Sequence, residues 1–447
     1  MIRVSLILSV LVLLVLGSCK TTVDKSSYEP IITDSKYFHK ALGGLTDVIV
    51  HDIFSPPVAS RVYVYPCIAA YETISKKDST INSLAGKLTG LTASPDPKNP
   101  DNVSLDISAL AAFYKVAQAL IFSEDKLQAF SDAYFHELDS LGVPNSVINA
   151  SKEYGELMAT HIIAWMDKDN YKESRSFSKF SLSDDPARWK PTPPGYMEGI
   201  EPHWNKIRTM VLDSAQQYKI APPPAFDLKK NSDFRKFTDE VYEVVNNINE
   251  EERAIASFWD CNPFVMNQTG HIMYATKKIT PGGHWMGIST IASKKMNHSI
   301  GAAIKSSTLV AISLFDAFIA CWDEKYRSSL VRPETVINEY VDEDWLPILQ
   351  TPPFPEHTSG HSVISTAASE ILTAMFGDTF AYDDDVELKY GLPIRSYNSF
   401  REAASEAAIS RLYGGIHYMP AIKEGEKQGV MVGAHIIDKL NIEQFAE

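Results

Sequence analysis

Apolar residues recur along this chain at intervals of three and four positions, and this period constrains the fold more than any other feature of the sequence. Such spacing gathers apolar side chains on one face of an α-helix, whereas a half-buried strand needs strict alternation. Sustained alternation is lacking, so the sequence predicts an all-α fold of packed helical bundles. The expected helical segments are residues 60–74, 105–122, 125–141, 147–166, 232–248, 250–258, 297–321, 362–376 and 400–412.

Size, charge and cysteine usage narrow the class of protein. The chain has 447 residues, of which 45% are hydrophobic and 22% charged, enough for two lobes or one large domain. The net charge of −14 argues against a nucleic-acid partner. The internal cysteines Cys67, Cys261 and Cys321 have no metal-ligand spacing and predict no disulfide framework.

The N-terminus has the pattern of a bacterial lipoprotein signal. Arg3 precedes an apolar run, and Leu16-Gly17-Ser18-Cys19 fits a lipobox. Cleavage before Cys19 and acylation of its thiol would leave a lipid-anchored protein outside the cytoplasm, with 1–19 as the signal peptide and 20–35 as a polar tether. An ordinary secretory signal that happens to contain a cysteine is the alternative. The pattern leaves open the periplasmic side of the inner membrane, the outer membrane and the cell surface.

A pair of cations begins the part of the chain that carries chemistry. Lys325 and Arg332 are seven positions apart, so on one helix they would stand on the same face, two turns from each other. Pro333 cannot continue a helix interior, which predicts that Arg332 lies near a helix end. Both side chains can then point into one cavity.

The second block, Ser359-Gly360-His361, marks a helix start. The proline-rich stretch 351–355 holds the chain extended before it, and the apolar run 362–376 follows. A helix that begins at about Ser359 presents unpaired N–H groups and a positive dipole end to an anion. Gly360 lets the backbone approach that anion closely, and the Ser359 hydroxyl adds another donor.

The third block contains Arg411 and His417, which are six positions apart and would face different sides of a continuous helix. Gly414-Gly415 lies between them and predicts a break that returns His417 to the ligand that Arg411 holds. Taken singly, such residues are more often solvated charges or structural histidines. Together the three blocks predict a pocket for a tetrahedral oxyanion.

These blocks resemble the signature K-x6-R-P, P-S-G-H and S-R-x5-H-x3-D of one superfamily. It joins the vanadium-dependent haloperoxidases with the type-2 phosphatidic-acid phosphatases and bacterial acid phosphatases. The sequence departs at Thr358, where the signature has proline, and at Ala421, where it has an acid. The first change is expected to alter only a turn. The second removes the partner that orients the nucleophilic histidine of the phosphatases, unless a carboxylate from elsewhere replaces it.

The resemblance implies a large helical-bundle fold of the haloperoxidase and acid phosphatase type, with an N-terminal helical region over 36–250 and a catalytic bundle over 251–447. It also implies vanadate as the cofactor. His417 would be the axial ligand of the metal and His361 the acid–base group, while Lys325 would polarise bound peroxide. The residues implied to hold vanadate or phosphate are Lys325, Arg332, Ser359, Gly360, Arg411 and His417.

Aromatic and polar neighbours of the blocks extend the resemblance. Trp322 and Phe354 look like the pocket wall of vanadium chloroperoxidases and bacterial iodoperoxidases, although core packing is the competing interpretation. The segment 258–263 resembles one from which relatives send a polar residue to the arginines, which makes Asp260 or Asn262 a candidate for that role. A loop is expected at 281–285, where His284 is a possible substrate contact, although a structural histidine is the better interpretation.

Three functions remain open at this point. A haloperoxidase would oxidise halide, iodide or bromide before chloride, with hydrogen peroxide. An acid phosphatase would form a phosphohistidine at His417, and a lipoprotein that keeps the fold would only bind an oxyanion. About three hundred residues precede the first block, which favours the haloperoxidase. The apolar stretch 306–322 is interrupted by Asp316 and predicts a buried core helix, so the lipid anchor is the one membrane contact expected. The oligomeric state is left open.

Overall fold

The computed structural model describes residues 25–98, 100–263, 265–269 and 272–445. Over these residues the regular secondary structure is helical apart from two short antiparallel hairpins, which confirms the all-α prediction. The signal peptide and Cys19 lie outside the described residues. Part of the predicted tether packs on the protein. Tyr28 and Ile32 are buried, and Asp34 forms an isolated antiparallel β-bridge with Ser299. The apolar residues of this segment explain why it packs on the body.

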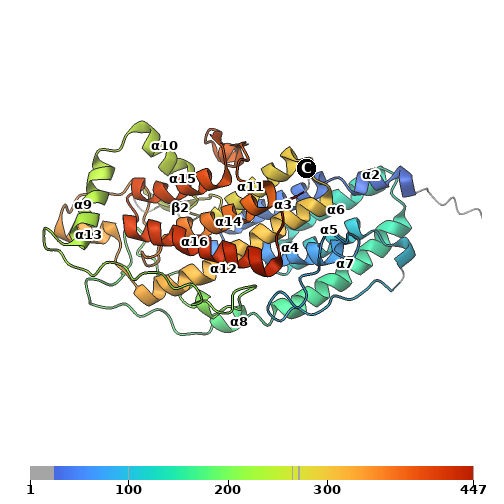
Figure 1. The fold of residues 1–447 in the computed structure, drawn as a ribbon, viewed down its shortest axis with the longest axis horizontal. Helices are drawn as coiled ribbons and strands as arrows, with labels where there is room; N and C mark the ends of the chain where they lie inside the picture. Colours follow the sequence, from blue (N-terminus) through green and yellow to red (C-terminus); the bar gives the residue numbers. More distant parts are fainter. Residues whose placement is uncertain (1–24, 99, 264, 270–271, 446–447) are drawn as a thin grey trace, which may run out of the picture.

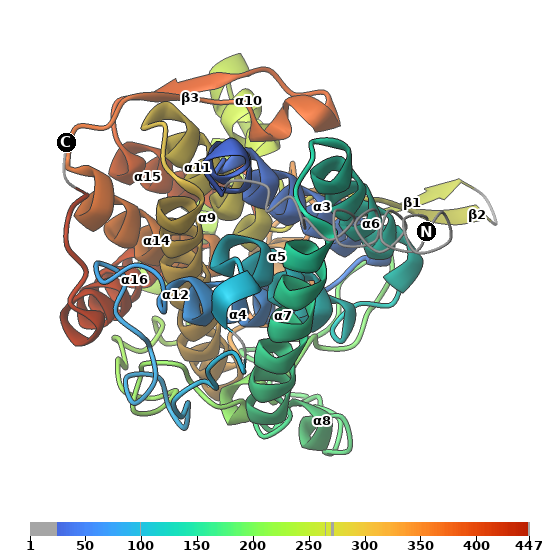
Figure 2. The ribbon, with the colours of Figure 1, turned by 90° about the vertical axis from the view of Figure 1, so that its right-hand side faces the viewer.

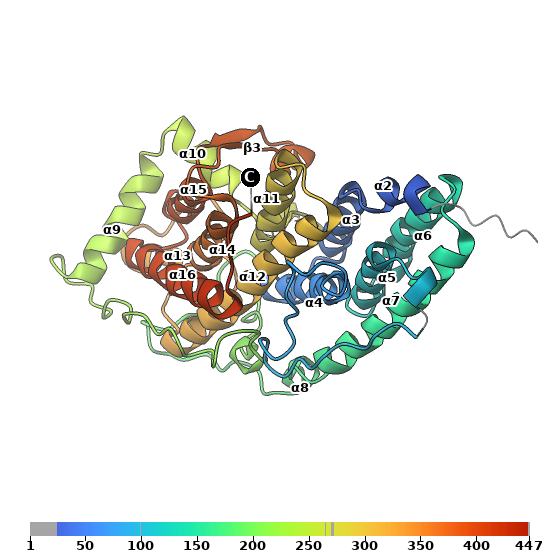
Figure 3. The ribbon, with the colours of Figure 1, turned by 45° about the vertical axis from the view of Figure 1, so that its right-hand side comes forward.

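The helices nearest the N-terminus form a bundle at one end of the molecule (Figures 1 and 3). Its helices pack closely where small residues face each other. A Cβ atom added at Gly155 would lie only 2.5 Å from the Cβ atom of Ala111, so the contact requires glycine. The helices are α2 (Glu29–Ile32), α3 (Lys36–Asp52), α4 (Pro56–Ile74), α5 (Leu105–Gln118), α6 (Glu124–Ser140), α7 (Asn145–Met166) and α8 (Tyr171–Ser174).

A second bundle surrounds α12 (Ile300–Ser328) and carries the three sequence blocks. Every residue of α4 is buried, and α12 packs on α4 as well as on α14, so the two bundles share one core (Figure 1). The other helices of this bundle are α11 (Pro281–Lys295), α14 (Gly360–Phe376), α15 (Phe400–Tyr413) and α16 (Met419–Leu440).

Glycines bring α16 against α14. A Cβ at Gly429 would lie 2.5 Å from the carbonyl oxygen of Val363, and one at Gly425 would lie 3.0 Å from that of Ser359. The helix backbones therefore approach more closely than any side chain would permit. This contact places the start of α14 beside the chain that leads into α16.

Smaller elements close the end of the second bundle and its edges. Helices α9 and α10 begin at side-chain caps, with Ser232 capping α9 and a capping box between Asn249 and Glu252 at α10. The hairpin of β1 and β2 lies at the rim of the molecule (Figure 2). These elements are α9 (Asp233–Asn246), α10 (Glu250–Phe258), β1 (Val265–Thr269), β2 (Ile272–Thr276), α13 (Pro333–Tyr340), β3 (Tyr382–Asp384) and β4 (Arg395–Tyr397).

Helix α12 is the one described helix with the length and hydropathy of a membrane span. In its most apolar window 94% of the residues are buried inside the protein, which confirms the predicted core helix. Asp316 is tolerated there because its carboxylate accepts hydrogen bonds from the backbone N–H groups of Met210, Val211 and Leu212.

Two local predictions are wrong. The expected loop at 281–285 is the first turn of α11, because Thr280 caps the N–H of Gly283 and Pro281 takes the first helical position. Lys325 and Arg332 do not share a helix, since α12 ends at Ser328 and Ser329 adopts a left-handed conformation with φ of 48°. Arg332 is instead the N-cap residue of α13.

Candidate oxyanion site

A cavity of about 40 Å³ lies where the second bundle meets the start of α4. A single water needs roughly 10–15 Å³ of such space, so the cavity has room for a small polyatomic anion. The residues predicted from the sequence that line it are Trp322, Phe354, Gly360, His361, Arg411, His417, Asp260 and Asn262.

Lys325 stands in the last turns of α12 and is fully buried. Its Nζ donates to the backbone carbonyls of Pro355 at 3.0 Å and Glu356 at 3.1 Å, and also to that of Thr358. A Cβ at Gly360 would lie 3.9 Å from Cε, so the side chain passes beside the start of α14. Burial lowers the pKa of Lys325 to about 7.

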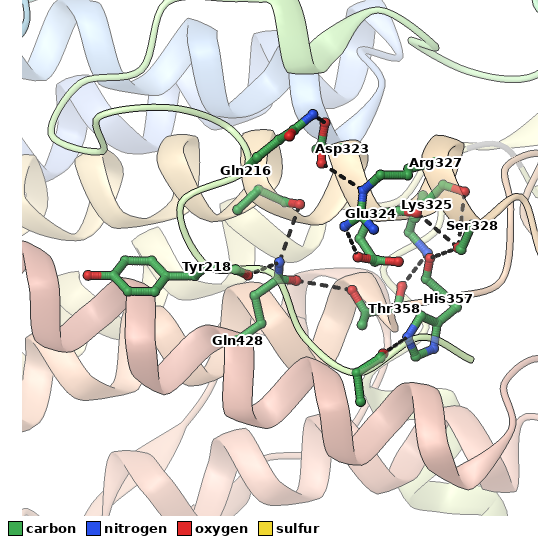
Figure 4. A network of polar contacts seen from close by, with 12 residues as sticks. Gln216, Tyr218, Asp323, Glu324, Lys325, Arg327, Ser328, His357, Thr358 and Gln428 are labelled. Atoms are coloured by element: carbon green, nitrogen blue, oxygen red, sulfur yellow. Dashed lines mark hydrogen bonds and ion pairs between the residues drawn. The ribbon is translucent and has the colours of Figure 1, made fainter. Parts of the chain in front are cut away.

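A network of polar contacts holds the loop that Lys325 contacts (Figure 4). Ser328 donates to the carbonyl of His357 at 3.2 Å, and the Thr358 hydroxyl donates to Gln428 Oε1 at 3.2 Å. Gln428 in turn donates to the carbonyl of Tyr218 at 3.1 Å. The threonine that stands in place of the signature proline therefore supplies a hydrogen bond that fastens this loop to α16.

Arg332 contacts the loop before α14 and the segment before α16. Its Nε donates to the carbonyl of Phe354 at 2.9 Å, and Nη1 donates to the carbonyl of Ile416 at 2.8 Å and to His417 Nε2 at 3.1 Å. Nη2 is buried and finds no hydrogen-bond partner among the described residues. Burial lowers the pKa of Arg332 to about 10, which still leaves the guanidinium charged at neutral pH.

Arg411 is held by the segment that follows α10. Its Nη2 donates to the carbonyl of Trp259 at 2.7 Å, and its Nε to Ser410 Oγ at 2.9 Å. Burial lowers the pKa of Arg411 to about 10, and the nearby charge of Asp260 opposes that shift. The carboxylate of Asp260 itself pairs with Lys278. The predicted segment thus contacts Arg411 directly through a backbone oxygen, while Asp260 acts on it through its charge.

His417 returns to the site after the break between α15 and α16. Gly415 takes φ of 76°, which only glycine adopts readily, so the Gly414-Gly415 break is confirmed. His417 Nδ1 lies 2.8 Å from Glu356 Oε1, while Arg332 donates to Nε2. The proton is therefore on Nδ1 and the lone pair on Nε2. Burial and the nearby charges of Arg332 and Lys325 hold the pKa of His417 well below its usual value.

Glu356 is a residue of the site that the sequence did not identify. Its Oε1 accepts from both His417 Nδ1 and the backbone N–H of Tyr418 at 3.0 Å, and burial raises its pKa to about 7. It supplies the carboxylate that the signature places at residue 421, where this chain has alanine. No spacing rule links residues 356 and 417, and the missing acid was the one signal that another carboxylate was needed.

His361 lies in the first turn of α14 and lines the cavity. Burial and the charge of Arg411 hold its pKa well below the usual value, although a hydrogen bond to the Trp259 backbone opposes this. Its Nε2 is buried without a hydrogen-bond partner among the described residues. Trp259 therefore holds Arg411 and His361 through the same stretch of backbone.

The predicted helix start is confirmed at Ser359, which is the N-cap of α14 and whose hydroxyl oxygen accepts from the N–H of Ser362 at 3.3 Å. The first N–H groups of a helix have no partner within it, so Gly360 and His361 present donors to the site. A helix N-terminus of this kind stabilises an anion.

Trp322 and Phe354 form one wall of the cavity, with ring centroids 5.0 Å apart. Trp322 also donates to the carbonyl of Ile200 at 3.1 Å, so the loop around Ile200 contacts this wall. The Phe354 ring lies 5.0 Å from Lys325 Nζ and 5.1 Å from the guanidinium carbon of Arg332. Trp322 and Phe354 are both buried, so each side chain packs in the core and also lines the cavity.

The electrostatics of the site favour a tetrahedral oxyanion. Arg411 lines the cavity, whereas Arg332 reaches it through its hydrogen bond to His417 and Lys325 lies beside the start of α14. Asp260 lines the cavity as well, and Glu356 contacts it through His417. Buried charges are costly unless they are paired, so the two arginines, which stay charged at neutral pH, favour a bound anion. The unpaired Arg332 Nη2 can donate to an oxygen of such an anion, and the unpaired His361 Nε2 can accept from a protonated oxygen. Vanadate and phosphate both fit this donor set.

Comparisons with known proteins agree with this geometry. Residues 305–443 match the family model of the "VCPO second helical-bundle domain". A solved structure titled as the first bacterial vanadium-dependent iodoperoxidase is 49% identical, with a TM-score of 0.88 over 93% of this chain and 99% of the other. A search of curated proteins gave no match.

Two structures of a bacterial vanadium-dependent chloroperoxidase, in holo and apo forms, share the fold at lower identity. Each is 16% identical with a TM-score of 0.65 over 87% of this chain, and the match covers 93% of the holo chain and 94% of the apo chain. With its high identity to the iodoperoxidase over nearly the full length of both chains, this chain belongs to the vanadium-dependent haloperoxidase family.

Proposed function

We propose that the protein binds vanadate and uses hydrogen peroxide to oxidise a halide, iodide before bromide, to the hypohalous acid. The observation that carries the proposal is the pair of unpaired buried atoms, Arg332 Nη2 and His361 Nε2, beside three buried cations. When bound, vanadate supplies the activation of peroxide toward attack by a halide.

The protein's own groups have distinct roles in this proposal. Arg332 and Arg411 neutralise the oxyanion through charge-assisted hydrogen bonds, and Lys325 adds a third positive charge. The Ser359 hydroxyl and the N–H of Gly360 donate from the start of α14. These donors fix both the position and the orientation of the anion.

The two histidines face the anion in complementary states. Glu356 accepts the Nδ1–H of His417, so the Nε2 lone pair, which accepts from Arg332 in the anion-free site, would be the group that holds vanadium. His361 donates to the Trp259 backbone, so its Nε2 also carries a lone pair and can take a proton from peroxide. The lowered pKa of each imidazole keeps both neutral at ordinary pH.

The pocket wall supports the order of halides. Trp322 and Phe354 present apolar surface, which disfavours the strongly hydrated chloride ion. The relative at 49% identity is itself titled an iodoperoxidase, which supports iodide as the preferred halide.

Iodide oxidation by protein stripped of vanadium tests the cofactor. We expect no activity without vanadate, recovery when it is added, and competition by inorganic phosphate. Elemental analysis for vanadium should accompany the assay. Full activity in protein that contains no vanadium would reject the proposal.

Substitution of each histidine tests the roles. His417→Ala should lose vanadate binding. His361→Ala should keep it while halide oxidation falls by about 10²–10⁴-fold, the range typical of a general acid–base group. Equilibrium vanadate binding to both variants decides the assignment, and the reverse result would exchange the two roles.

One observation also favours phosphate-ester hydrolysis as a second activity. Glu356 orients His417 as the signature acid would, so the anion-free site is suited to nucleophilic attack by Nε2 on phosphorus. We expect vanadate-free protein to hydrolyse p-nitrophenyl phosphate and vanadate to inhibit it. A protein that binds the anion but supports neither reaction would be the non-catalytic oxyanion-binding lipoprotein.

We also propose that Cys19 anchors the protein to a membrane by its lipid. The support is the lipobox in the sequence. Fractionation of cells that express the full chain should place it with membranes, and Cys19→Ser should move it to the soluble or unprocessed pool. Equal membrane association of both forms would contradict the anchor.

A further inference from the structure

A second cluster of chemically reactive side chains adjoins the oxyanion site, and one of its members, Cys261, lines the cavity. Cys261 Sγ is 3.6 Å from His284 Nδ1 and 3.7 Å from Glu387 Oε1, and the last two atoms are 3.1 Å apart. All three residues are buried. They come from the segment after α10, from the first turn of α11 and from the 3-10 turn Val386–Tyr390, near β3 (Figure 3).

The three separations between ligand atoms, 3.1 to 3.7 Å, are close to those along one face of a metal coordination tetrahedron. Zinc binds sulfur at about 2.3 Å and nitrogen or oxygen at about 2.0–2.1 Å, so tetrahedral ligand atoms lie roughly 3.3–3.6 Å apart. Thiolate, imidazole and carboxylate are also the ligand types that zinc takes in proteins. We propose that Cys261, His284 and Glu387 bind a divalent transition-metal ion, zinc by the chemistry of the ligands.

The surroundings of His284 suit a metal ligand. Its Nε2 lies 2.8 Å from Asp384 Oδ2, and a histidine that ligates a metal commonly donates its other N–H to a carboxylate. With that proton on Nε2, the Nδ1 lone pair faces Cys261 and Glu387. Asp384 also accepts from the N–H of Val386 at 3.1 Å, which fixes it to the turn that carries Glu387.

The cluster needs positive charge at its centre. Glu387 Oε1 and the lone pair of Nδ1 would repel each other at 3.1 Å if nothing lay between them. A proton on Nδ1 would relieve this contact and make His284 an imidazolium between two carboxylates. A metal ion would relieve it as well and would also engage the sulfur, which is nearly equidistant from both atoms. The convergence of three ligand atoms favours the metal.

The metal site would support the oxyanion pocket through the segment that follows α10. The Trp259 ring stacks on the His284 imidazole with centroids 4.5 Å apart, and the Trp259 backbone holds Arg411 and His361. Cys261 lies two residues further along the same segment. A metal at this position would fix the segment that orients these two pocket residues, and three protein ligands leave one position for water.

Metal analysis of the full chain, purified without added metal or chelator, tests the inference. We expect about one zinc ion per chain in the wild type and none in Cys261→Ser. Cys67→Ser is the matched control, because Cys67 is an equally buried cysteine in α4, outside the cluster, and this variant should keep its zinc. Cobalt added to metal-free wild type should give the charge-transfer absorption of a thiolate–cobalt bond.

The measurements use protein without vanadate, so their result is independent of the haloperoxidase proposal. Wild type that contains no zinc and takes up neither zinc nor cobalt would overturn the metal site and leave the imidazolium in its place. A cobalt complex without the thiolate band would remove Cys261 from the ligand set. If Cys261→Ser does not fold, the wild-type metal content and cobalt spectrum still decide.

Discussion

Glu356 occupies the place of an acid that the signature puts elsewhere in the chain, and its negative charge stabilises a hydrogen bond from His417. Glu356→Gln keeps the size and an acceptor oxygen but removes the charge. We expect vanadate affinity to fall by about 10–100-fold, the usual effect of losing such an outer partner. Glu72→Gln, which changes a buried acid of α4 far from the site, is the control.

Equilibrium titration with vanadate measures this effect. An unchanged dissociation constant in Glu356→Gln would show that the carboxylate does not tune His417. A second variant adds a positive test: Ala421→Asp in a Glu356→Ala background restores the acid at the signature position, and we expect partial recovery of affinity.

Anion affinity should depend on pH through two residues of the site. Burial lowers the pKa of Lys325 to about 7 and raises that of Glu356 to about 7. As pH rises through this value the lysine loses its positive charge and the carboxyl gains a negative one, and both changes oppose anion binding. The affinity should therefore fall above pH 7, by up to about tenfold per pH unit for each proton taken up on binding.

Molybdate is a suitable probe, because it is tetrahedral and remains a dianion across this range. Its dissociation constant should rise steadily from pH 7 to 9 in the wild type. Lys325→Met should bind more weakly and show a flatter profile. An affinity independent of pH in the wild type would contradict the lowered pKa of Lys325.

At the scale of single residues, the sequence identifies the side chains of the site but not the backbone groups that hold them. Lys325, Arg332, Arg411 and both histidines could be found because their types and spacing match an oxyanion signature. The carbonyl of Trp259 could not, since a main-chain oxygen has no residue type. The Cys261 cluster is similarly hidden, because its ligands are spread from residue 261 to 387 and no local spacing joins them.

At the scale of elements, close packing of α14 and α16 sets the geometry of the site. Gly429→Ala places a Cβ 2.5 Å from the Val363 carbonyl and 3.1 Å from the backbone nitrogen of Ala367, and backbone cannot move aside as a flexible side chain can. We expect a loss of about 1–3 kcal/mol in the free energy of unfolding. Oxyanion affinity should fall as well, because α14 begins at Ser359.

Gly43→Ala is the matched control for this change. Gly43 lies in α3, is exposed, and has no atom within 4 Å of the position of a new Cβ. Alanine there should raise the free energy of unfolding by about 0.5–1 kcal/mol, because it restricts the unfolded chain. Chemical denaturation of the two variants gives the comparison, and equal effects would show that the α14–α16 contact is not tight.

Helix boundaries were predictable where local chemistry determines them. The proline-rich stretch before Ser359 and the Gly414-Gly415 pair identify a start and a break that the structure contains. The end of α12 was missed because Ser329 adopts a left-handed conformation that serine rarely takes, so nothing local signals it. The start of α11 was missed because Pro281-Gly282-Gly283 has the composition of a loop, although proline suits the first turn of a helix.

At the scale of the whole molecule, the two bundles depend on each other. Helix α4 is buried throughout and packs on α12, so the region over 36–250 covers apolar surface of the region that carries the site. The boundary at residue 250 therefore remains a prediction about sequence organisation, not about independent folding.

Expression of residues 251–447 alone tests this dependence. The fragment would expose the face of α12 that packs on α4, and a large apolar patch of this kind promotes aggregation. We expect an aggregated or loosely packed product that binds a hydrophobic dye and no vanadate. A soluble fragment with a cooperative thermal transition would show that the bundle folds independently.

Each of the three buried cations is aimed by main-chain carbonyls: Lys325 by the loop 355–358, Arg332 by residues 354 and 416, and Arg411 by residue 259. A point substitution at any of these acceptor positions changes a side chain and leaves the carbonyl in place. Substitutions at the neighbouring positions therefore leave the orientation of the three cationic side chains unchanged. An insertion or deletion in these loops would disturb that orientation, because one residue more or less moves the following carbonyl groups away from the side chains that donate to them.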